Sequence, residues 1–150
     1  MKLAPVRIRP WERGDFARLA AAAPGLSERT LWLRFWGAVP TLPAAYLRST
    51  EQRWPCSWDA VAAIDGDELI GWAEYGRYPD RPDDADIAVC VVDAEQGQGI
   101  GPALMAAVIE HARAAGLRSV HADIAPYNER ARRSWARVTG SDARTLPLAS

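Results

Sequence analysis

The sequence has few cysteines and no long apolar run. Only Cys56 and Cys90 are present among 150 residues, too few for a disulfide framework or a cysteine-rich zinc site, so we expect no metal. No stretch approaches the roughly 20 apolar residues of a membrane span, and the first residues lack the apolar segment of a signal peptide. We therefore expect a reduced, cytoplasmic protein with no membrane partner.

An excess of positive charge is also missing. The chain has 18 basic and 19 acidic residues, which gives a net charge of −1. Without a global positive field we expect no nucleic-acid partner, and any anionic ligand must be held locally. The composition, 49% hydrophobic and 25% charged, is that of a globular protein. Because no linker or repeat divides the chain, we predict a single domain over residues 1–150.

Hydrophobic periodicity predicts an α+β (α/β) fold. The predicted strands are at 6–9, 58–64, 69–75, 87–92 and 119–124, and the predicted helices are at 16–23, after Ser27, at 44–48, at 102–115 and after Asn128. Asp65-Gly66 predicts a hairpin turn, whereas the acidic stretch 78–84 predicts a solvated loop. The strands at 87–92 and 119–124 flank one helix, which indicates a parallel βαβ crossover in a mostly antiparallel sheet flanked by helices.

A glycine-rich segment, Gln96-Gly97-Gln98-Gly99-Ile100-Gly101, joins the apolar strand to the next helix. Glycines let a phosphate approach the backbone, and the first helical turn offers free N–H groups and a positive dipole end. No Gly-Lys-Ser/Thr follows, which excludes a P-loop, and Pro102 replaces the third glycine of a dinucleotide fingerprint. A tight turn without any ligand is the remaining alternative.

The segment matches the pattern Q/R-x-x-G-x-G/A, and in this the sequence resembles the GNAT N-acetyltransferase superfamily. The resemblance covers about residues 6–138, because the order of strand, motif, helix, strand and Asn128-led helix is also that of the family. The stretch 26–36 looks like a Leu-Ser-x-x-x-x-Tyr-x-Arg-Phe-Phe helix found in GNAT domains of bacterial protein-lysine acetyltransferases. The resemblance implies a GNAT-like sheet whose βαβ crossover carries the acyl-CoA site.

It also implies the activity, which is direct transfer of an acetyl group from acetyl-CoA to a primary amine on a small molecule or a protein lysine. Acetyl-CoA is then expected to bind to Val91, Val92, Gln96, Gly97, Gln98, Gly99, Ile100, Gly101 and Asn128. A backbone N–H near Val91 or Val92 would stabilise the oxyanion. Arg132 or Arg133 is expected to meet the adenosine phosphate.

Two carboxylates are candidates for the catalytic base. Asp86 precedes the apolar strand, where similar bacterial acetyltransferases often carry a catalytic glutamate. A carboxylate beside an apolar cleft can take a proton from an incoming ammonium group. Glu74, on the neighbouring strand, is the second choice. Alternatively, Asp86 is only one of several acidic loop residues.

The sequence departs from the family in its last helix and its tail. Many members carry a tyrosine seven residues after the asparagine, which protonates the leaving thiolate, but that position is Trp135. Tyr127 and Ser134 are the available substitutes. This departure favours an alternative function, a non-catalytic acyl-CoA-binding or regulatory module. Because only ten residues follow Gly140, we expect a missing or truncated edge strand and, from the uncovered edge, a homodimer.

Overall fold

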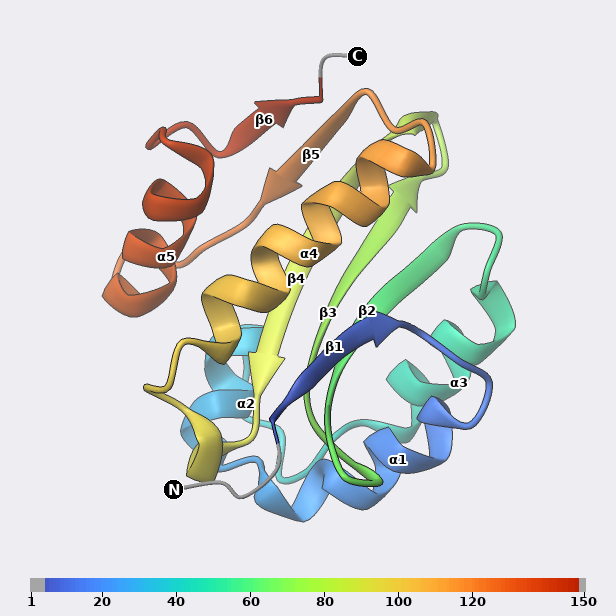
Figure 1. Ribbon diagram of the computed structural model, residues 1–150, viewed down its shortest axis with the longest axis vertical. Helices are drawn as coiled ribbons and strands as arrows, with labels where there is room; N and C mark the ends of the chain where they lie inside the picture. The colour runs from blue at the N-terminus through green and yellow to red at the C-terminus, as the bar shows by residue number, and fades with distance from the viewer. Residues whose placement is uncertain (1–4, 149–150) are drawn as a thin grey trace.

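The computed structural model describes residues 5–148 and has a six-stranded sheet with its strands in chain order (Figure 1). The strands are β1 (Arg7–Pro10), β2 (Trp58–Asp65), β3 (Glu68–Tyr78), β4 (Arg81–Val91), β5 (Ser119–Ala122) and β6 (Thr145–Pro147). The helices are α1 (Asp15–Ala22), α2 (Glu28–Phe35), α3 (Ala44–Arg53), α4 (Ile100–Ala114) and α5 (Glu129–Thr139).

Every pair of neighbouring strands is antiparallel except β4 and β5, which are parallel and joined through α4. This arrangement confirms the predicted α+β class and the single βαβ crossover. The crossover needs the length of a helix because the end of one parallel strand and the start of the next lie at opposite ends of the sheet.

The segment between β3 and β4 differs from its prediction. Residues 78–84 do not form a solvated loop, because β3 continues to Tyr78 and β4 begins at Arg81. The acidic side chains are tolerated there since they are mostly exposed while the backbone pairs within the sheet. The β2–β3 turn lies one residue later than predicted, with Gly66 at a φ of +65° between the paired Asp65 and Glu68.

The two faces of the sheet carry different helices. Leu104 of α4 lies 3.0 Å from where a side chain on Gly71 would begin, and His111 of α4 lies against Tyr75, so α4 covers the face of the odd-numbered β3 residues. The even-numbered residues face α1–α3, because Trp72 donates a hydrogen bond to Tyr46 of α3. His111 is half-buried in this contact.

The described part of the chain ends at the short edge strand β6, which pairs only with β5. A truncated edge strand was expected, and β6 has three residues. The homodimer expected from this edge stays a prediction. Among residues 5–148, no helix has both the length and the apolar character needed to cross a membrane.

Candidate active site

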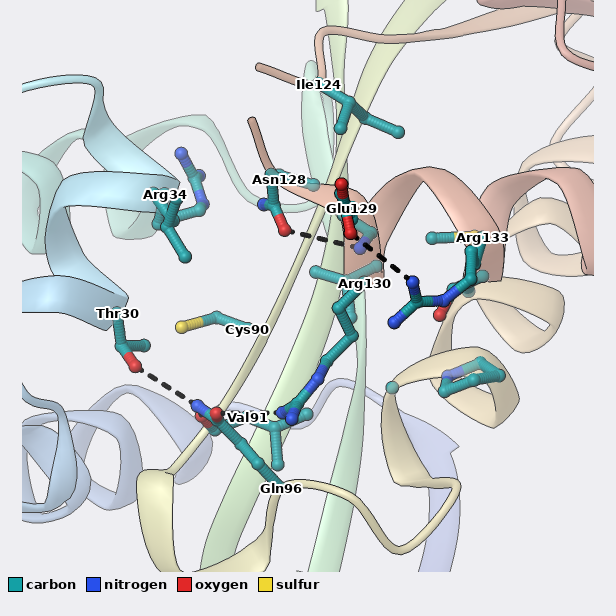
Figure 2. Close-up of a pocket in the computed structure, with 18 of the residues that line it drawn as sticks. Thr30, Arg34, Cys90, Val91, Gln96, Ile124, Asn128, Glu129, Arg130 and Arg133 are labelled. Atoms are coloured by element: carbon teal, nitrogen blue, oxygen red, sulfur yellow. Dashed lines mark hydrogen bonds and ion pairs between the residues drawn. The ribbon is translucent and has the colours of Figure 1, made fainter. Parts of the chain in front are cut away.

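A cavity opens where β4 and β5 part. The two strands pair from Asp84–Ser119 to Ile87–Ala122, after which β4 continues to Val91 while the chain leaves β5. The cavity has a volume of about 670 Å³ and is lined by α2, β4, the glycine-rich segment, the start of α4, the β5–α5 connection and α5. Figure 2 shows Cys90 and Val91 on β4 between α2 and α5.

The parted strand offers backbone donors to this cavity. Val92 donates its N–H to Ile70 of β3 at 2.9 Å, so it cannot serve as the oxyanion donor that the sequence suggested. N–H groups of successive residues in a strand point to opposite sides. The N–H groups of Val89 and Val91 therefore point away from β3, into the gap where β5 no longer pairs.

The glycine-rich segment exposes its backbone as expected. Gly97 and Gly99 have φ values of +78° and +86°, a region that favours glycine, and a side chain at either would meet no atom within 4 Å. Gly99 is the N-cap of α4, so the next amides have no intrahelical acceptor. The side chain of Ile100 is buried in the core, which leaves only its backbone available to a ligand.

Gln96 joins three sides of the cavity. Its Nε2 donates to Thr30 Oγ1 of α2 at 3.1 Å and to the carbonyl oxygen of Val91 at 3.0 Å, while its Oε1 accepts from Arg130 of α5 at 3.3 Å. Figure 2 shows Arg130 reaching from α5 to this amide. Gln96 therefore fixes the entrance to the glycine-rich segment, in addition to any contact with a ligand.

The start of α2 is fastened to the same region. Ser27 caps the helix by accepting from the Thr30 amide, as predicted, and Asp93 accepts from the Ser27 amide and the Thr30 hydroxyl, each at 2.9 Å. Burial alone would raise the pKa of the Asp93 carboxyl, but these hydrogen bonds lower it below its usual value. Asp93 thus holds α2 against the end of β4.

Several basic side chains line the cavity. Sequence reasoning missed Arg29 and Arg130, which line it together with Arg133 and Arg137. Arg133 also pairs with Glu129 at 3.6 Å. Arg132 instead donates to the carbonyl of Pro126 and is not a lining residue. Arg130, Arg133 and Arg137 are three and four residues apart, which places them on one face of α5. This spacing was the signal available in the sequence.

Asn128 begins α5, with its Oδ1 accepting from the Ala131 amide at 3.3 Å, and it also lines the cavity. Trp135 is fully buried and donates to the carbonyl of Ala143 at 2.7 Å, so its ring belongs to the core. Ser134 and Tyr127 line the cavity. Tyr127 accepts a hydrogen bond from Trp32 of α2 at 3.1 Å, which links α2 to the β5–α5 loop.

Glu74 is buried on the α2–α3 face of the sheet. Its carboxylate accepts hydrogen bonds from Trp58 Nε1 at 2.7 Å, from the Tyr46 hydroxyl and from Arg34 Nη2. Burial and the neighbouring carboxylate raise the pKa of Tyr46 well above its usual value, so Tyr46 stays a donor. Because its carboxylate already accepts these three hydrogen bonds, Glu74 is poorly placed to take a proton from a substrate.

We expect Glu74→Gln to lower the free energy of unfolding by about 3 kcal/mol, because it leaves the mostly buried Arg34 guanidinium without its counter-charge. Urea unfolding followed by circular dichroism measures the change. Glu68→Gln, at an exposed position of the same strand, is the matched control and should change the midpoint little. Equal midpoints for the two variants would contradict the structural role given to Glu74.

Asp86 is exposed and lies within β4, not before it as the sequence suggested. It is one residue from Ile87, where β4 and β5 part, and it pairs in register with His121. Its carboxylate accepts a hydrogen bond from the Tyr78 hydroxyl; burial and this contact raise the pKa of Tyr78 to about 12. Asp86 is not itself a lining residue, but Asp123, which follows β5, is.

Cys90 also lines the cavity, and its side chain is buried. Burial raises the pKa of this thiol to about 12, and the nearby Arg34 offsets the effect only in part. A thiol with this pKa is protonated at neutral pH and is a poor nucleophile. The geometry therefore gives Cys90 a packing role in the cavity floor and offers no activated thiol for a covalent intermediate.

Parted parallel strands, a glycine-rich turn and a helix N-terminus therefore meet at this one cavity. A model of the acetyltransferase (GNAT) family matches residues 27–140 of the chain. The chain therefore belongs to the GNAT family of acetyltransferases. The family assignment and the α+β fold predicted from the sequence are both confirmed.

The chain is also similar to individual acetyltransferases. The L-2,4-diaminobutyric acid acetyltransferase of Methylotuvimicrobium alcaliphilum is 33% identical over 82 residues, which are 54% of this chain and 46% of that protein. The chain thus matches less than half the length of this curated relative. The structure resembles the GNAT domain of S. lividans PAT with a TM-score of 0.80, at 26% identity over 89% of this chain and 80% of that one.

The structure also resembles yncA of Salmonella typhimurium, which was solved with its cofactor acetyl-CoA. The TM-score is 0.76, and the superposition covers 98% of this chain and 96% of that one. With 17% sequence identity, this second likeness supports the fold alone.

Proposed function

We propose that the protein transfers an acetyl group from acetyl-CoA to the primary amine of a small molecule, by direct attack in a ternary complex. The observation that carries this proposal is the cavity between β4 and β5, which joins strand amides to an open helix N-terminus. The name of the curated relative, a diaminobutyric acid acetyltransferase, supports a small amine as acceptor over a protein lysine.

The fit of acetyl-CoA follows from the groups that the chain offers. The N–H groups of Val89 and Val91 would pair with the amides of the pantetheine arm, as an added strand would. The amides from Gln98 to Gly101 would hold the pyrophosphate, excluding Pro102, which has no N–H. Arg130 lies beside this segment through its contact with Gln96 and adds positive charge.

The acetyl donor supplies a thioester carbonyl, and the chain supplies a base for the amine. Asp86 takes a proton from the incoming ammonium, directly or through water, and the free amine nitrogen then attacks the carbonyl carbon. The new C–N bond forms and the C–S bond breaks. The acetylated nitrogen then loses its remaining extra proton, which passes through the Tyr127 hydroxyl or water to the leaving thiolate. We prefer Asp86 to Glu74 because three donors already engage the Glu74 carboxylate.

A panel of amines assayed with acetyl-CoA for free thiol release tests the function. We expect release with small primary amines, at rates above those with lysine-containing peptides. Acetylation of peptides alone would instead favour a protein lysine as the acceptor, as the resemblance of residues 26–36 suggests. If acetyl-CoA binds tightly in calorimetry but no amine causes release, the non-catalytic module is the better description.

We also propose that the chain is a single domain in a reducing, cytoplasmic setting. The hydrogen-bonded sheet runs from β1 to β6, and one connected core includes residues from Trp11 to Leu148. Residues 1–4 and 149–150, which belong to the proposed domain, lie outside the described residues. Cys56 is exposed and unpaired, as a reducing compartment permits.

A further inference from the structure

Arg34 occupies a distinct place in the wall of the cavity. It belongs to the last turn of α2, lines the cavity, and retains 18% of its side-chain exposure. Its guanidinium lies 4.6 Å from the ring centre of Phe35 and 5.4 Å from that of Tyr46. Stacking against two rings and an ion pair with Glu74 hold the group in one orientation.

The ion pair does not use all of Arg34. A guanidinium has five N–H donors, and Glu74 accepts from Nη2. The Nε atom is buried and has no hydrogen-bond partner among the described residues. Glu74 also accepts from Tyr46 and Trp58, so its negative charge is shared among three donors. An unsatisfied buried donor costs free energy, so the pair with Glu74 leaves the guanidinium only partly satisfied.

The position of Arg34 separates it from the phosphate end of the cavity. Its partner Glu74 pairs in register with Ala88, one residue beyond the point where β4 and β5 part. The glycine-rich segment lies at the far end of β4, beside Arg130. Arg34 is therefore near the reacting end of the site, where an acceptor must lie to reach a thioester.

We propose that Arg34 binds a carboxylate of the acceptor, so that the acceptor is a small amino acid carrying a reactive primary amine. The proposal rests on the acetyl transfer proposed above. A guanidinium matches a carboxylate in geometry and charge, and it stays charged throughout the accessible pH range. Its fixed orientation beside the parted strands would hold the amine of such an acceptor near Asp86.

The experiment compares acceptors that differ only in their carboxylate. L-2,4-diaminobutyrate, its amide 2,4-diaminobutyramide and 1,3-diaminopropane are assayed with acetyl-CoA. For the wild-type protein we expect kcat/KM to be about 10- to 100-fold higher for the carboxylate than for the amide, the value of one or two charge-assisted hydrogen bonds. Equal kcat/KM values for the three acceptors would overturn the proposal while leaving the acetyl transfer intact.

Arg34→Lys tests the residue. Lysine keeps the positive charge opposite Glu74 but lacks the planar fork, so the preference for the carboxylate should fall about tenfold or more, mainly through KM. Arg48→Lys, on the exposed side of α3, is the matched control and should keep the preference. A fall in kcat that is equal for all three acceptors would overturn the proposal, since it would assign Arg34 to the oxyanion instead.

A binding measurement separates this proposal from the proposed function. Calorimetry with CoA-loaded protein measures the affinity for the diaminobutyrate and its amide without turnover. If turnover is absent but the carboxylate binds more tightly and Arg34→Lys removes that advantage, the carboxylate site stands and the acetyl transfer fails. If the carboxylate and the amide bind equally, or neither binds, the carboxylate site is overturned.

Discussion

Gly99→Val should reduce the affinity for acetyl-CoA by about 100-fold or more, the loss expected when two hydrogen bonds to a charged group are removed. Gly99 has a φ of +86° and precedes the first free amides of α4. A β-branched residue resists this φ, and its side chain would also stand where a phosphate must approach. Titration calorimetry with acetyl-CoA and CoA measures the affinity.

Gly116→Val is the matched control for this strain. Gly116 follows the other end of α4, has a φ of +85°, and has no atom within 4 Å of an added side chain. Both variants carry a strained backbone, which costs about 1–3 kcal/mol in stability. Only Gly99→Val should lose affinity. Equal affinities for the two variants would place the pyrophosphate elsewhere.

Asp86→Asn should retain acetyl-CoA binding and lose about 10²- to 10⁴-fold in kcat at neutral pH, the usual contribution of a general base. The acceptor amine has a pKa of about 10.4 and is almost wholly protonated at neutral pH. Asparagine keeps the shape and can still accept from Tyr78, but it cannot take the proton. Part of the lost rate should return as pH rises and free amine accumulates.

Asp84→Asn is the control for this substitution. Asp84 lies on the same strand two residues earlier and accepts from the Ser119 hydroxyl at 2.7 Å. Its loss should leave the pH profile of kcat unchanged. If Asp86→Asn also keeps its kcat while Glu74→Gln abolishes turnover without unfolding, Glu74 is the base. A loss in Asp123→Asn alone would assign the proton transfer to the β5 side of the cavity.

Local patterns predicted most of the fold because each element carried its own signal. The periodic helix at 16–23, the helix after Ser27 and the apolar strand before the glycine-rich segment were all predicted with the correct element type. The segment 78–84 was misassigned because charged and proline residues are normally depleted in strands. Pairing with β3 on one side and β5 on the other overrides that preference, which no local pattern reveals.

The site was harder to predict than the fold. The glycine-rich segment was recognisable because close phosphate approach requires particular backbone angles. The Arg34–Glu74 pair joins residues 40 positions apart, and Trp32 meets Tyr127 across 95 positions. Such contacts depend on how α2 and the β5–α5 loop dock, so the sequence alone gave no reason to pair them.

The parting of β4 and β5 should also make the stability of the folded chain depend on the concentration of a ligand that binds between these strands. The N–H groups of Val89 and Val91 point into a gap, because β5 pairs with β4 only as far as Ile87. A ligand that supplies carbonyl groups there acts as a substitute strand, bound only in the folded state. By mass action, the free energy of unfolding then rises by about 2.7 kcal/mol at a ligand concentration of 100 times Kd. The chain should therefore resist heat and proteolysis best where such a ligand is abundant.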